Sequence, residues 1–87
     1  MTDTVRCWFV ERGYDNRDLV TLAYATPEGD RVFRQELAAG AIESKTVTAA
    51  EDVEPHNLEA VDDPETRDRY ADEVARVRSD HDPDDEV

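Results

Sequence analysis

The sequence is poor in cysteine, lysine and glycine, and each shortage narrows the function classes open to the chain. The single cysteine, Cys7, excludes a disulfide within the chain, which favours a cytoplasmic protein over a secreted one. Lys45 is the only lysine among the ten basic residues. The three glycines lie far apart, as turn formers do, so the chain contains no glycine-rich phosphate-binding loop.

Long apolar runs are also lacking. None approaches the roughly 20 residues that a membrane-spanning helix needs, and no signal-peptide core follows Met1. We therefore expect a cytoplasmic protein that does not bind membranes. The 87 residues allow one small domain. A domain of that size buries only about 60–65% of its unfolded surface, which leaves it marginally stable.

Acidic residues dominate what is present. Twenty-three acids face ten bases, for a net charge of −13, and the apolar residues are mainly alanine and valine. This combination, with arginine preferred over lysine, is typical of a salt-adapted protein, because molar salt shortens the Debye length to about 3 Å and screens the self-repulsion. Residues 44–87 carry −10 of the charge, so we expect this half to loosen first at low salt. An acidic interaction tail or partial disorder is the alternative explanation.

One hairpin organises the predicted fold. Two β-prone runs, 19–26 and 30–37, flank a Thr-Pro-Glu-Gly turn whose Gly29 can adopt the left-handed conformation. A type I turn with a glycine bulge places Tyr24 opposite Val32. A shift of one residue exchanges the two faces of the second run, so the register depends on this turn.

The first predicted strand, residues 5–12, makes the sheet apolar on both faces. Alternation assigns its side chains to two sets. One face holds Val5, Cys7 and Phe9, and the other holds Arg6, Trp8, Val10 and Arg12. In the hairpin, Val20, Leu22, Tyr24, Val32 and Arg34 share one face, and Leu19, Ala23, Ala25, Phe33 and Leu37 share the other. A sheet with one solvated face would show a clean alternation of apolar and polar residues, which is absent here.

Residues 38–54 allow two interpretations, helix or strand. Residues 38–44 form either a helical turn ended at Gly40 or a continuation of the ribbon. Residues 45–50 form a weak fourth strand, or Thr48 instead caps a short helix over residues 49–54. Residues 56–61 are expected to be an extended connector.

Besides the hairpin, the sequence predicts a C-terminal helix with clear start and stop signals. Asp63 is a good N-cap and Pro64 a good first residue, and Asp82 before Pro83 predicts an end near residues 79–81. An apolar stripe recurs at helical spacing; it comprises Thr66, Tyr70, Ala71, Val74 and Val77. The predicted fold is α+β, a three- to four-stranded antiparallel β-meander with this helix packed on one face. Residues 1–81 form the domain and residues 82–87 an acidic disordered tail.

No catalytic, metal or cofactor site is predicted, so we expect a protein that is not an enzyme. Cys7 lies in mid-strand among apolar neighbours and is interpreted as a buried structural cysteine. His56 and His81 have no second nitrogen or sulfur ligand at metal spacing. Residues 80–84 begin like a calcium loop but lack its glycine and its bidentate glutamate.

The remaining candidate site is a sheet face formed by Arg6, Trp8, Val10 and Arg34. One helix covers one face only, so we predict that the other face is buried by a partner, with a second copy of the chain as the leading choice. Our leading prediction is a non-enzymatic, salt-adapted interaction domain that self-associates through its sheet. The alternative is nucleic-acid or nucleotide binding by stacking on Trp8 beside Arg6 and Arg34, which the net charge disfavours.

Three segments carry a family resemblance: Arg6–Arg12 (RCWFVER), Tyr24–Arg31 (YATPEGDR) and Asp62–Ala71 (DDPETRDRYA). Together they resemble a group of small uncharacterised proteins from halophilic archaea, over nearly the whole chain. The resemblance implies a cytosolic, salt-adapted setting. It implies no activity.

Overall fold

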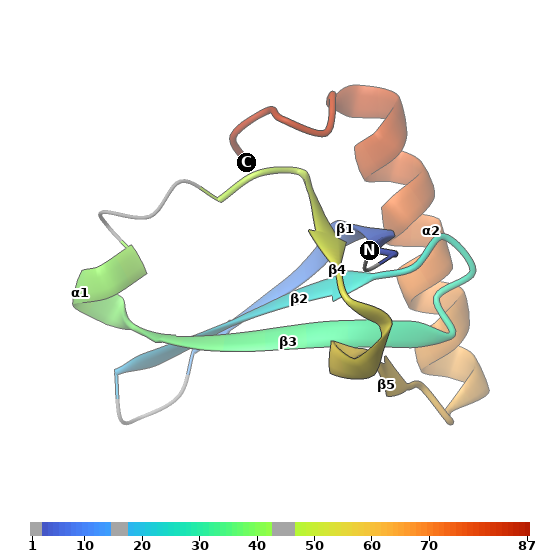
Figure 1. Ribbon diagram of the computed structural model, residues 1–87, viewed down its shortest axis with the longest axis horizontal. Helices are drawn as coiled ribbons and strands as arrows, with labels where there is room; N and C mark the ends of the chain where they lie inside the picture. Colours follow the sequence, from blue (N-terminus) through green and yellow to red (C-terminus); the bar gives the residue numbers. More distant parts are fainter. Residues whose placement is uncertain (1–2, 15–17, 43–46) are drawn as a thin grey trace.

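The computed structural model describes residues 3–14, 18–42 and 47–87, and within them one twisted sheet carries a long helix on one face (Figure 1). The elements are β1 (Val5–Tyr14), β2 (Leu19–Ala25), β3 (Arg31–Ala38), α1 (Ala39–Ile42), β4 (Ala50–Val53), the 3₁₀ turn η1 (Pro55–Asn57), β5 (Glu59–Ala60) and α2 (Pro64–Asp80). All strand pairs are antiparallel, in the order β4-β1-β2-β3-β5.

The predicted α+β class is correct, but the described residues form five strands rather than three or four. The two additional strands are short edges. β4 pairs with the first residues of β1, and β5 pairs with only Arg31 and Val32 of β3. The chain between them, including η1, therefore passes from one edge of the sheet to the other.

The turn between β2 and β3 is one residue longer than predicted. The amide of Gly29 donates to the carbonyl oxygen of Thr26 at 2.8 Å, which is the expected type I turn, and Gly29 has a φ of +72°. However, the amide of Thr26 donates to the carbonyl oxygen of Arg31 at 3.1 Å. The buried Thr26 hydroxyl also donates to Asp30 at 2.8 Å, which stabilises the longer loop.

This loop changes the register of the hairpin. Tyr24 lies opposite Phe33 and Ala25 opposite Val32, whereas the sequence analysis placed Tyr24 opposite Val32. The side-chain period of a strand is two residues, so a shift of one residue moves every β3 side chain to the other face. Phe33 and Leu37 therefore join Tyr24, and Val32 joins the alanines of β2.

A β-bulge in β1 corrects a second face assignment. Phe9 pairs with Tyr24 and Glu11 with Ala23, which leaves Val10 as the extra residue. Trp8, Val10 and Glu11 consequently face α2. Alternation placed Arg12 on the same face as Trp8. In the structure its guanidinium instead lies on the far face, 5.8 Å from the ring centroid of Phe9.

The core has two layers, one on each face of the sheet. The helix-side cluster consists of Trp8, Ala23, Ala25, Val32, Ala49, Ala50, Val61, Tyr70, Val74 and Val77, with Val10 packed against it. The far-side cluster consists of Cys7, Val20, Leu22, Tyr24, Val47 and Val53, with Val5, Phe9, Phe33, Leu37 and Leu58 packed against it. The prediction of a sheet apolar on both faces is thus confirmed.

The helix α2 forms as predicted. The Asp63 carboxylate accepts hydrogen bonds from the Thr66 amide at 3.2 Å and the Thr66 hydroxyl at 2.7 Å, and Pro64 opens the first turn. These contacts satisfy donors that a helix N-terminus leaves unpaired. The Asp63 pKa is lowered, chiefly by the Thr66 hydroxyl.

The described residues between β3 and β4 include a helical turn, α1, which agrees with the helical interpretation of residues 38–44. The turn continues through Gly40 to Ile42, although the prediction ended it at Gly40. Residues 45 and 46 of the predicted fourth strand, and residues 43 and 44 before it, lie outside the described residues. The strand that forms, β4, begins at Ala50, where the predicted strand ended, and residues 49–54 do not form the alternative helix capped by Thr48.

Residues 82–87 pair with the chain that leads into β4, although the sequence analysis expected a disordered tail. The amide of Ala49 donates to Asp85 O at 2.8 Å and the amide of Val87 donates to Val47 O at 2.9 Å. Thr48 and Glu86 form an isolated antiparallel bridge. Hydrogen bonds between backbone groups hold this segment in place. The prediction of disorder was based on its acidic side chains, which do not indicate backbone pairing.

Candidate interaction surface

The four residues of the predicted sheet face lie in different surroundings. Trp8 and Val10 pack in the helix-side cluster. Arg6 is exposed and forms an ion pair with Asp52 of β4, with 3.1 Å between Nε and Oδ1. Arg34 is exposed on β3.

The indole ring of Trp8 lies beneath α2. Trp8 is only 7% exposed, and the Arg78 guanidinium of α2 lies 5.8 Å from the centroid of its ring. A nucleobase cannot stack on this ring while α2 is in place. Of the candidate face, Arg6 and Arg34 are therefore exposed, whereas the aromatic ring is not available for stacking.

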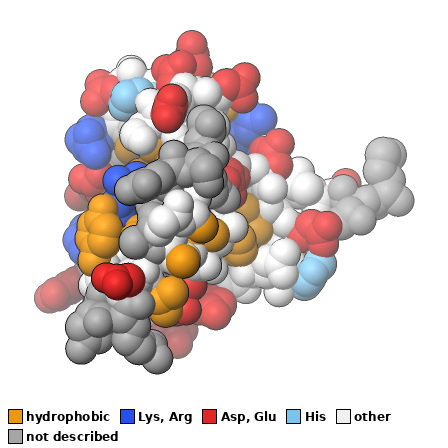
Figure 2. Space-filling view, turned by 90° about the vertical axis from the view of Figure 1, so that its left-hand side faces the viewer, with side chains coloured by type: hydrophobic (Ala, Val, Ile, Leu, Met, Phe, Trp, Pro, Cys, Tyr) orange, Lys and Arg blue, Asp and Glu red, His pale blue; other side chains and the backbone are white. Residues whose placement is uncertain are grey.

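A group of accessible apolar side chains lies on the far face, which was not predicted as a site from the sequence. Phe9, Phe33 and Leu37 are only partly buried, and Tyr14, opposite Val20 on the same face, is 72% exposed. Figure 2, which faces the α1 end of the molecule, shows hydrophobic side chains at the surface with acidic ones around them. The hairpin register decides this grouping, so the sequence pattern alone could not reveal it.

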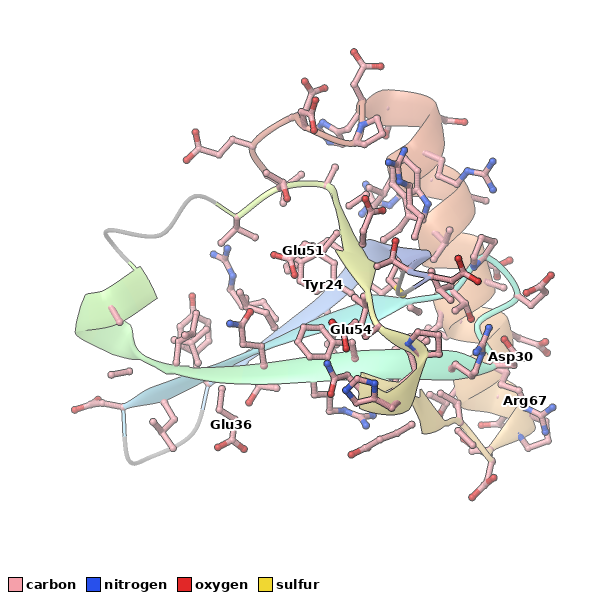
Figure 3. The ribbon with its side chains drawn as sticks, in the orientation of Figure 1. Tyr24, Asp30, Glu36, Glu51, Glu54 and Arg67 are labelled. Atoms are coloured by element: carbon pink, nitrogen blue, oxygen red, sulfur yellow. The ribbon has the colours of Figure 1, made fainter. Side chains whose placement is uncertain are left out.

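The centre of the far face is covered by the chain itself. The ring of Phe9 meets that of Tyr24 edge to face, with centroids 5.6 Å apart. The Tyr24 hydroxyl donates to the carbonyl oxygen of Thr48 at 3.2 Å, and Val47 packs in the same cluster as Tyr24. Burial and the nearby Glu51, seen beside Tyr24 in Figure 3, raise the pKa of Tyr24. The accessible apolar groups therefore lie around a covered centre.

Cys7 is a structural residue of this face, as predicted. It is fully buried, and its thiol donates to the carbonyl oxygen of Val5 at 3.6 Å. Burial raises the pKa of Cys7 to about 11, so the reactive thiolate is scarce at neutral pH.

The polar contacts between β1 and α2 are structural as well. The Tyr70 hydroxyl donates to Glu11 Oε2 at 2.9 Å, and Arg69 Nη1 lies 3.3 Å from Oε1 of the same carboxylate. Both oxygens are therefore engaged in attaching α2 to the bulged strand.

An open depression of about 320 Å³ lies where the hairpin turn meets the start of α2. Its lining is mainly charged and consists of Glu28, Asp30, Pro64, Arg67 and Asp68. Figure 3 shows Asp30 and Arg67 together at this end of the molecule. The described residues hold no group of three or more histidine, cysteine or acidic side chains arranged to bind a metal.

The outer edge of β3 is a second accessible feature. β5 covers this edge only at Arg31 and Val32, which leaves the rest of β3 without a strand neighbour there among the described residues. Arg34 and Glu36 are exposed on it. Arg34 was predicted as part of the sheet-face site, but Glu36 was missed because only the observed sheet order reveals the edge.

One family model matches the whole chain, residues 1–87. The chain belongs to a family of unknown function, DUF7967. Membership agrees with the expected resemblance to an uncharacterised family, although the family description names no source or activity. No curated protein and no solved structure matches the chain. Within the described residues of this DUF7967 member, no helix has the length and apolarity to cross a membrane.

Proposed function

We propose that this DUF7967 member is a non-enzymatic interaction domain that associates with a second copy of itself through the sheet. One observation carries the proposal. The sheet is apolar on both faces, and α2 covers only one of them.

The far face supplies the accessible apolar area. Tyr14 is largely exposed, and Phe33 and Leu37 are partly exposed. Exposed apolar area of this kind, bordered by charged residues, is typical of protein interaction sites. Self-association also offsets the limited core that a chain of 87 residues can build.

We further propose that the domain works in a salt-rich cytoplasm. The net charge of −13 opposes the approach of two copies in dilute buffer. At molar salt the Debye length is about 3 Å, so this repulsion is confined to charges in contact.

Light scattering tests the proposal. The mass of the protein in molar potassium chloride should approach that of a dimer as the protein concentration rises. Leu37→Ser should lower the association constant, and Thr4→Ser, at an exposed position outside the far-side cluster, is the matched control. A monomeric mass at every concentration contradicts the proposal.

The nucleic-acid alternative has less support, because the ring of Trp8 is covered by α2. We expect that RNA added in molar potassium chloride leaves the fluorescence of Trp8, the only tryptophan, unchanged. A saturable change in fluorescence would reverse this preference.

A further inference from the structure

The edge of β3 shows where two copies can meet. We propose that β3 pairs with β3 of a second copy, antiparallel and centred on Gln35, so that the two sheets become one. This inference rests on the proposed function, self-association through the sheet, and assigns the contact to a particular edge.

The backbone groups of β3 point alternately to its two edges. The carbonyl oxygen of Asp30 accepts from Val61 on the β5 side at 2.9 Å, while that of Arg31 accepts from Thr26 on the β2 side. Because these directions alternate along a strand, the backbone groups of Arg34 and Glu36 point to the outer edge. An open edge with such groups is a template for another strand.

The order of side chains along β3 complements the same order in a second, antiparallel copy. Residues 33–37 read Phe-Arg-Gln-Glu-Leu. In an antiparallel pair centred on Gln35, Arg34 of each copy lies opposite Glu36 of the other. Residues of opposite charge that lie directly opposite each other on neighbouring strands attract. The two-fold symmetry of the dimer produces this Arg34–Glu36 pair twice.

The backbone geometry agrees with this register. The backbone N–H and C=O groups of Arg34 and Glu36 point to the outer edge, so each Arg34–Glu36 pair takes the hydrogen-bonded position. The two pairs together exchange about four N–H···O bonds. Moving the centre to Glu36 keeps the outward directions but places two carboxylates opposite each other, which is unfavourable. The charges therefore select one register.

The same arrangement brings the two far faces together. A two-fold axis perpendicular to the sheet keeps equivalent faces on the same side, so both copies of α2 lie on one side. Phe33 and Leu37 point to the other side, and each Phe33 comes near Leu37 of the second copy. The ladder is confined to residues 33–37, because β5 already pairs with Val32. Ala38 of the second copy, which this register places opposite Val32, has to turn away from Glu59.

The charges of the single chain leave Glu36 available for this contact. Arg34 Nη1 lies 3.3 Å from Glu59 Oε2 in an exposed pair, and its side chain remains 45% exposed. The Glu36 side chain has no ion-pair or hydrogen-bond partner among the described residues, and Figure 3 shows it projecting from the sheet on the β3 side. A guanidinium has five donors, so Arg34 can bind both carboxylates.

Charge reversal tests the register. The dimer dissociation constant is measured by sedimentation in about 0.5 M potassium chloride, where contact pairs survive and the long-range repulsion is screened. Arg34→Glu and Glu36→Arg should each weaken the dimer about tenfold, because two attractive pairs become repulsive. The double variant should restore the dissociation constant to within about threefold of the original value.

Two further variants distinguish the loss of this contact from a loss of folding and from a change in net charge. Glu28→Arg makes the same charge change as Glu36→Arg on the exposed hairpin turn and should leave the dimer intact. Glu36→Pro removes an outward N–H while keeping the ladder to β2, so it should abolish the dimer with an unchanged circular dichroism spectrum.

The outcomes distinguish this inference from the proposed function. A dimer that none of these changes weakens overturns the β3 contact and leaves self-association in place. Weakening by both single reversals without restoration in the double variant also overturns the pairing. A chain that is monomeric at all concentrations overturns the proposed function, and the β3 contact with it.

Discussion

Gly29 in the hairpin turn lies directly against the backbone of Arg67 in α2. A Cβ on Gly29 would overlap the carbonyl oxygen of Arg67 and come within 2.8 Å of the Ala71 amide nitrogen. The turn thus does two things, since it reverses the chain and forms the surface on which the first half of α2 rests.

Gly29→Ala should therefore be strongly destabilising. The residue has a φ of +72°, and the added Cβ meets backbone atoms that cannot rotate away. We expect the free energy of unfolding to fall by about 3 kcal/mol in urea titrations. Gly40→Ala is the control, because a Cβ there meets nothing within 4 Å, and its effect should stay within about 1 kcal/mol. Equal effects of the two changes would contradict the packing argument.

The hydrogen bond from Tyr70 to Glu11 should contribute measurably to stability. Tyr70→Phe removes the 2.9 Å bond without changing the packed ring, and we expect a loss of about 1 kcal/mol. In a double-mutant cycle with Glu11→Ala, most of this loss should appear as coupling energy. Tyr14→Phe, at a residue that is 72% exposed, serves as the control and should have no effect. Additive losses in the cycle would mean that the two residues act independently.

The stability of α2 should decrease in acid because of Asp63. Its pKa is lower in the folded chain than in the unfolded chain, so its contribution is complete above the unfolded value, near pH 4. That contribution is lost as the pH falls through the lower, folded pKa. The urea midpoint of Asp63→Asn, which keeps a capping oxygen, should therefore depend less on pH below about 4. Identical pH profiles for the two proteins would exclude this contribution.

Low salt should loosen the chain, beginning with residues 44–87. This half carries a net charge of −10, and its charges repel one another over longer distances as screening weakens. Between molar and tens of millimolar salt, amide exchange should accelerate first in α2 and in the pairing of residues 82–87 with residues 47–50. Circular dichroism that stays constant across this range would refute the salt-adaptation argument.

The elements whose structure local chemistry decides could be predicted from the sequence. Asp63 and Pro64 predicted the start of α2, and the buried residues Tyr70, Val74 and Val77 match the predicted stripe. The predicted faces were wrong where one extra residue, in a bulge or a turn, moves all following side chains to the other face of the sheet. The bulge at Val10 moved Arg12 to the far face, and the longer turn exchanged the faces of β3.

The candidate site changed for the same reason. Trp8 and Val10 were chosen as partner residues from alternation, which says that they share a face but not which face α2 covers. Tertiary packing placed them under α2. The accessible groups instead lie on the far face and along the edge of β3, where Glu36 and Leu37 became candidates only after the strand order was known.

By itself, the sequence determined the class of the fold, the hairpin, the capped C-terminal helix and an apolar character on both faces of the sheet. These follow from backbone preferences and side-chain periodicity, which act over a few residues. Only the tertiary structure decided the register, the two edge strands, the pairing of residues 82–87 and the face beneath α2. Each of these depends on contacts between residues far apart in the chain, such as Gly29 with Arg67 and Tyr70 with Glu11, whose energies no local pattern contains.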